Sequence, residues 1–219
     1  ALKAKYAQWT DPNYPILQVA EYYRDGVVLQ RNQPILVWGH ANKGVKVTVT
    51  LDGKAQTVSP NELEQWSVNF PARKASTEPI TLEVKSTHGF NRTVKDILVG
   101  DVWYLTGSTL LSTEWPYDRR NKEVDPPETM PLVREFCRKT KSSSFTTPRK
   151  RRFETGGGKY RSHWLTADFS KEGSGVTMFA YEFAKALNRP GIPQGFITMS
   201  SGQGGRNRQF ASPLSWSSF

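Results

Sequence analysis

Two short polar segments of the chain follow apolar runs and carry the residue types that acyl-transfer chemistry needs. Gly107-Ser108-Thr109 comes just after the run Val102–Leu105, so a hydroxyl group is presented on a turn. Gly204-Gly205 follows the run Gly195–Met199, and backbone without a Cβ lets amide N–H groups approach a substrate closely. A hydroxyl nucleophile beside oxyanion donors is the arrangement of an esterase. The same residue types also serve as helix caps and turns, so the pattern alone leaves both interpretations open.

A helix is predicted before the second of these segments. Residues 176–187 place apolar side chains at the i, i+3 and i+4 spacing of an amphipathic helix. Ser174 or Gly173 would cap its start, and Asn188, followed by a proline and a glycine, would end it.

The apolar runs around this helix predict a parallel sheet that brings the two polar segments together. Buried strands are predicted at 102–105, 132–136 and 195–199. Strand, helix and strand in this order are typical of an α/β domain, in which ligands bind beyond the carboxyl ends of the strands. We therefore expect the segments 106–113 and 200–207 to lie at one edge of the sheet.

The chain before residue 100 shows a different pattern, short strands separated by turn signals. Val45–Leu51 alternates apolar and polar side chains, and Asp52-Gly53 after it is a type I′ hairpin signal. The predicted strands are Val27–Gln30, Ile35–His40, Val45–Leu51, Lys54–Val58, Trp66–Phe70, Ile80–Lys85 and Thr93–Val99. Their spacing predicts an antiparallel β-sandwich domain over residues 1–99 with an N-terminal arm, followed by a second domain over 100–219.

Three segments resemble blocks of the sialate O-acetylesterase family, a branch of the SGNH (GDSL-like) hydrolases. Val27–Gly39 (VVLQRNQPILVWG) resembles the opening block of that family's sandwich. Leu98–Trp103 (LVGDVW) resembles the block that introduces its nucleophile, and Gly195–Gly205 is similar to a later glycine-containing block. The resemblance covers roughly residues 14–115 and 173–208. It implies that the second domain is a partial flavodoxin-like α/β domain of the SGNH type.

The resemblance also implies the site residues. The family's nucleophile is the Ser of Gly-Gln-Ser-Asn-Met, and that position holds Thr109 here, with Leu110 in place of the Asn. The methyl group of a threonine restricts χ1 and crowds the path of attack. The candidate catalytic hydroxyls and the candidate oxyanion and substrate-binding residues are Thr109, Ser108, Gly107, Gly204, Gly205 and Arg206.

The family's general base comes from an Asp-x-x-His pair, which these residues lack. The sequence reaches Phe219 before that pair or the family's Trp-Tyr-Gln-Gly-Glu block is expected. His163 is predicted to lie at the surface and not to act in catalysis. A hydroxyl without a base is a poor nucleophile at neutral pH. Two hypotheses stay open, and with them whether the chain is an enzyme. In the first, the chain is a carbohydrate O-acetylesterase-like protein that is an N-terminal piece of a longer hydrolase and is inactive alone. In the second, it is a non-catalytic glycan-binding or assembly module.

The formal net charge of +10 is concentrated in one segment of the chain. Residues 138–161 hold nine Lys or Arg and one Glu, which leaves the rest of the chain near neutrality. Serine, threonine and glycine surround these cations, which is typical of a solvated loop inserted into the second domain and disfavours a nucleic-acid partner. The expected partners are an O-acetylated, acidic carbohydrate and either a partner chain or a missing C-terminal half that completes the sheet.

The cysteine content and the lengths of the apolar runs exclude several kinds of site and a membrane-spanning helix. Cys137 is the sole cysteine, so an internal disulfide and a thiolate zinc cluster are excluded, and no metal or other cofactor is expected. No run approaches the length that a membrane-spanning helix needs. The start ALKAKYAQW resembles a processed end, which favours an extracytoplasmic protein that is secreted, periplasmic or lumenal.

Overall fold

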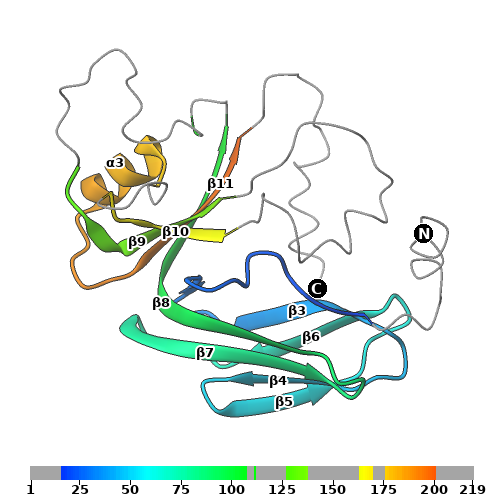
Figure 1. The fold of residues 1–219 in the computed structure, drawn as a ribbon. Coiled ribbons are helices and arrows are strands. Elements are labelled where there is room, and N and C mark those ends of the chain that lie inside the picture. The colour runs from blue at the N-terminus through cyan, green and yellow to red at the C-terminus, as the bar shows by residue number, and fades with distance from the viewer. Residues whose placement is uncertain (1–15, 108–110, 112–126, 138–162, 170–175, 201–219) are drawn as a thin grey trace.

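A computed structural model describes residues 16–107, 111, 127–137, 163–169 and 176–200 (Figure 1). Strands make up 56% of these residues and helix 8%. One sheet has three strands, and the other has eight and passes from the lower to the upper half of the molecule in Figure 1.

The lower half is a β-sandwich. Its strands are β1 (Leu17–Val19), β2 (Val28–Gln30), β3 (Ile35–Ala41), β4 (Val47–Leu51), β5 (Lys54–Val58), β6 (Gln65–Phe70), β7 (Ser76–Ser86) and the first part of β8 (Asn91–Gly107). The sheet β1-β3-β6 faces the layer β8-β7-β4-β5, and β2 pairs in parallel with β8. Alternating side chains of both layers form one apolar core. The sandwich strands predicted from the sequence are confirmed.

The turn between β4 and β5 shows why the hairpin forms where it does. Asp52 and Gly53 have positive φ values of 49° and 76°, as a type I′ turn requires. The flanking strands pair antiparallel from Leu51 opposite Lys54 to Val47 opposite Val58. The predicted Asp-Gly hairpin is confirmed.

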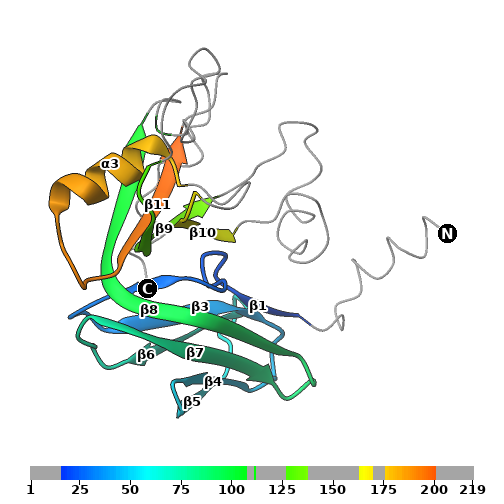
Figure 2. The ribbon, with the colours of Figure 1, turned by 60° about the vertical axis from the view of Figure 1, so that its left-hand side comes forward.

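The upper half contains residues 101–107 of β8 together with β9 (Met130–Cys137), β10 (His163–Ala167), α3 (Met178–Leu187) and β11 (Gln194–Ser200). Strand β11 lies between β8 and β9 and is parallel to both, whereas β10 pairs antiparallel with β9. Helix α3 lies along one face of these strands (Figure 2). Its Ala180 and Ala184 pack against Val133 and Phe196 in a second, smaller core.

The expectation of a partial flavodoxin-like α/β domain is wrong. The described residues are mostly β and contain a single helix, and they form two sheets. Strand β8 is continuous through Gly100, so the strand that ends the sandwich is also a strand of the upper half. The opposite face of the upper half packs toward the sandwich, because Phe136, Trp164 and Ile197 join the sandwich core.

The ends of the helix correct one prediction and confirm another. Thr177 is the N-cap, because its side-chain oxygen accepts a hydrogen bond from the backbone N–H of Ala180. The predicted caps Ser174 and Gly173 lie outside the described residues. Asn188 ends the helix in the left-handed conformation with φ 44°, as the sequence predicts.

Candidate active site

The carboxyl ends of β8 and β11 lie side by side. The parallel register runs from Gln194 opposite Asp101 to Ser200 opposite Gly107, where both strands end. The two polar segments predicted to share a sheet edge therefore leave the sheet from neighbouring positions. A Cβ on Gly107 would stand 3.0 Å from Cδ1 of Leu111, so the Leu111 side chain lies close to this glycine.

Gly107 is the candidate site residue that the structure places at this edge. The other candidates, Ser108, Thr109, Gly204, Gly205 and Arg206, lie outside the described residues, and their roles stay predictions.

A buried carboxylate that the sequence reasoning missed lies just below this edge. Glu135 of β9 is 0% exposed, and its Oε2 accepts a hydrogen bond from the backbone N–H of Thr177 at 2.5 Å. Its Oε1 accepts from the hydroxyl of Thr177 at 3.0 Å and from the hydroxyl of Thr198 on β11. The available signal was a glutamate inside the apolar run 132–136, since a charge in a buried strand needs partners.

A second carboxylate holds the opposite, amino end of the upper strands. Asp101 accepts hydrogen bonds from Nε of Arg31 at 2.7 Å and from Nη1 of Arg189 at 2.6 Å. Burial by itself would raise the pKa of Asp101, but hydrogen bonds from Arg31 and Arg189, and their positive charges, outweigh it and lower that pKa. This carboxylate is therefore ionised at neutral pH, and it links β8 to the segments that follow β2 and α3.

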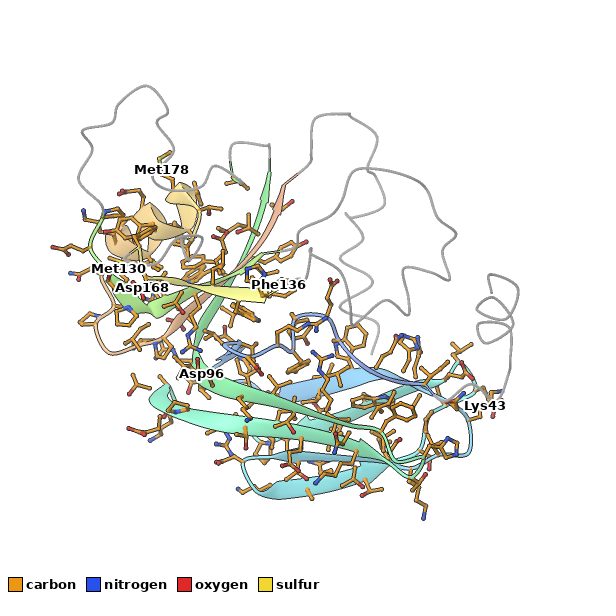
Figure 3. The ribbon with its side chains drawn as sticks, viewed as in Figure 1. Lys43, Asp96, Met130, Phe136, Asp168 and Met178 are labelled. Carbon is orange, nitrogen blue, oxygen red and sulfur yellow. The ribbon has the colours of Figure 1, made fainter. Side chains whose placement is uncertain are left out.

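Polar side chains also hold the upper half against the sandwich. Arg134 of β9 donates from Nη1 to the carbonyl oxygens of Gly26 at 3.0 Å and Asp96 at 2.6 Å. Its Nη2 donates to Oδ1 of Asp96 at 3.0 Å. Trp164 of β10 donates from Nε1 to the carbonyl of Tyr22 at 2.8 Å. Figure 3 shows Asp96 where β8 leaves the sandwich and Phe136 on the upper strands above it.

Other classes of site find little support in the described part of the chain. Among those residues, no group of three or more His, Cys, Asp or Glu could hold a metal ion. No described helix has the length and apolar character that crossing a membrane requires. A hollow of about 300 Å³ lies on the sandwich, lined by Asp52, Lys54, Phe70, Pro71, Ala72 and Arg73, and includes no residue of the carboxyl edge.

Comparison with solved structures finds similarity to a carbohydrate-active protein. No protein-family model and no curated protein sequence matches the chain. A β-glucuronidase of Bacteroides uniformis aligns with 49% of this chain and 14% of its own length at 14% identity, and its TM-score of 0.29 is too low to indicate a shared fold. A carbohydrate acetylesterase from Xanthomonas citri aligns over 85% of this chain with 28% identity and a TM-score of 0.65. The chain spans 40% of that esterase. The chain is thus related in sequence and structure to a carbohydrate esterase.

Proposed function

We propose that the carboxyl edge of β8 and β11 is a carbohydrate O-acetyl ester site of the sialate O-acetylesterase type. The similarity to a carbohydrate acetylesterase over most of the chain is the observation that carries this proposal. The register of Gly107 and Ser200 supports it, because the two polar segments leave the sheet side by side. Ligand sites of parallel strands occur at this kind of edge.

The chemistry follows from the candidate residues. The Thr109 hydroxyl oxygen attacks the acetyl carbonyl carbon, and backbone N–H groups of Gly107, Gly204 and Gly205 stabilise the oxyanion. The C–O bond to the sugar then breaks, the sugar oxygen takes the proton, and water releases acetate from the acyl-enzyme. Arg206 would bind an acidic sugar. Because no Asp-x-x-His pair occurs in these 219 residues to take the hydroxyl proton, we expect no turnover by this chain alone.

A second candidate function is a non-catalytic glycan-binding or assembly module. Thr109 and Leu110 stand where the resembled family has Ser and Asn, and this observation favours binding without turnover. Both functions would suit an extracytoplasmic protein whose basic segment 138–161 attracts an acidic glycan.

Ester turnover and sugar binding distinguish the two functions. In the full-length protein, we would measure hydrolysis of 4-nitrophenyl acetate and of an O-acetylated sialoside, and titrate the sialoside to obtain its Kd. For the esterase, Thr109→Ser raises turnover and Thr109→Val abolishes it, while the Kd of the sialoside changes little. Binding with no turnover in the wild type or Thr109→Ser supports the module. The absence of both binding and turnover contradicts both functions.

A further inference from the structure

The buried carboxylate of Glu135 connects three elements of the upper half. Glu135 belongs to β9, Thr177 caps α3, and Thr198 belongs to β11. Both oxygens of the carboxylate are used, Oε2 by the Thr177 backbone N–H and Oε1 by the two threonine hydroxyls. A shift of any one of these elements therefore changes the hydrogen bonds of the other two.

The contact with Thr198 lies beyond the last backbone pairing between β9 and β11. That pairing ends at Ile197 opposite Phe136, whereas β11 continues to Ser200 along β8. Past Ile197, the carboxylate of Glu135 reaches forward to the hydroxyl of Thr198. The carboxyl end of β11 is therefore held to β9 by a side chain where the backbone pairing has ended.

Other interactions already join the elements that Glu135 contacts. Backbone pairing already joins β9 to β11, and the Thr177 side chain already accepts from Ala180 at the start of α3. Taking a carboxylate out of water is costly even when it is well hydrogen-bonded, and apolar residues of similar volume often serve stability as well. The same face of the upper half is otherwise filled by apolar side chains such as Val133 and Phe196.

We propose that Glu135 is a positioning residue for the carboxyl-edge site: through Thr198 and Thr177 it fixes the end of β11 in register with the end of β8. This inference rests on the proposed function, because it assigns the edge the role of a site. Glu135 acts through Thr198 and the strand end that Thr198 belongs to, and not by contact with the ester.

The first measurement follows the backbone of the full chain without reference to activity. Amide hydrogen exchange of residues 198–200 and 105–107 is compared for wild type, Glu135→Gln and Thr198→Val. Because each substitution removes a hydrogen bond of the Glu135 carboxyl group, we expect about tenfold faster exchange at these amides and unchanged exchange at residues 47–51. Thr198→Ser keeps the hydroxyl and should exchange like the wild type. The exchange rate of the double variant Glu135→Gln/Thr198→Val should exceed that of either single variant by no more than about twofold, because both substitutions disrupt the same hydrogen bond.

Asp101→Asn is the matched control, since it neutralises a buried carboxylate at the other end of the same strands. It should lower stability and leave exchange at residues 198–200 unchanged. Exchange altered less than twofold in both Glu135→Gln and Thr198→Val would overturn the proposal. So would acceleration that extends equally to residues 47–51, because this would mean general destabilisation.

The second measurement is the Kd of the O-acetylated sialoside. We expect Glu135→Gln and Thr198→Val to weaken binding about tenfold, and Thr198→Ser and Asp101→Asn to bind like the wild type. If the wild type does not bind, the proposed function fails while the exchange data still decide the role of Glu135 in holding the strand ends. If binding is intact in variants whose strand ends exchange faster, the site is not at this edge and the positioning role is wrong.

Discussion

The sandwich and the upper half share strand β8 but are held together by different interactions. The sandwich core consists of alternating valine, leucine and aromatic side chains from two facing layers. The upper half has a smaller apolar core under one helix, and it buries the charged side chains Arg134 and Glu135 on neighbouring positions of β9. The sandwich core is thus mainly apolar, whereas the upper half also buries residues whose polar side chains form hydrogen bonds to other elements.

The largest expected effect tests whether the two halves unfold together. Phe196→Ala removes a fully buried ring of the upper half, and Leu82→Ala removes a fully buried side chain of the sandwich. We expect a loss of about 3–5 kcal/mol for Phe196→Ala and about 2–5 kcal/mol for Leu82→Ala. Because β8 runs through both halves, urea unfolding followed by tryptophan fluorescence should show a single transition in each variant. A separate early transition in Phe196→Ala would mean that the upper half unfolds independently.

The next largest effect concerns Gly100, where β8 continues from the sandwich into the upper half. A Cβ on Gly100 would lie 1.9 Å from the carbonyl oxygen of Pro193, so Gly100→Ala forces the start of β11 away. We expect a loss of about 3 kcal/mol in the free energy of unfolding. The control is Gly44→Ala in the sandwich, which has φ 78° and no atom near its Cβ position and should lose about 1 kcal/mol. Equal losses would show that β11 can shift freely at this point.

A smaller effect concerns the polar contact between the halves. Arg134→Met keeps the apolar part of the side chain but leaves the carbonyl oxygens of Gly26 and Asp96 without this donor. We expect a loss of about 2 kcal/mol in unfolding free energy, measured in urea. Exchange at residues 198–200 should stay unchanged, because Arg134 faces the sandwich and Glu135 faces α3. Faster exchange there would show that the two neighbouring side chains are not independent.

The smallest expected effect is a pH dependence at the amino end of the upper strands. The pKa of Asp101 is lower in the folded chain than its ordinary value, so the unfolded state binds a proton first as the pH falls. The stability that Asp101 contributes is complete at neutral pH and is lost below about pH 4, as the pH falls through the lowered pKa. Urea midpoints of wild type and Asp101→Asn should differ at pH 7 and converge at acid pH. A difference that is constant with pH would contradict this assignment.

The local elements of both halves could be predicted because their signals lie within a few residues. The alternation of Val45–Leu51 and the Asp52-Gly53 turn predict the hairpin, and Asn188 predicts the end of the helix. These features depend on backbone preference and on side-chain period, which neighbouring residues determine.

The arrangement of the upper half could not be predicted in this way. The antiparallel pairing of β10 with β9 joins His163 to Cys137 across a segment that carries no strand signal. Glu135 was missed because its partners, Thr177 and Thr198, are far from it in the sequence. Pairings and polar contacts of this kind depend on the tertiary fold, which overrides local pattern.

The continuity of β8 has a consequence for how the protein is made. On the ribosome, residues 91–107 leave the exit tunnel early, and their first part can pair at once with β7, the strand just before it. The second part needs β11, which follows roughly 90 residues later and cannot pair until it is synthesised. During that interval the sandwich carries an unpaired strand extension on its surface, open to the same segment of a neighbouring chain. Slow translation between the two strands would therefore favour aggregation, and a chaperone that covers an extended apolar strand would favour folding.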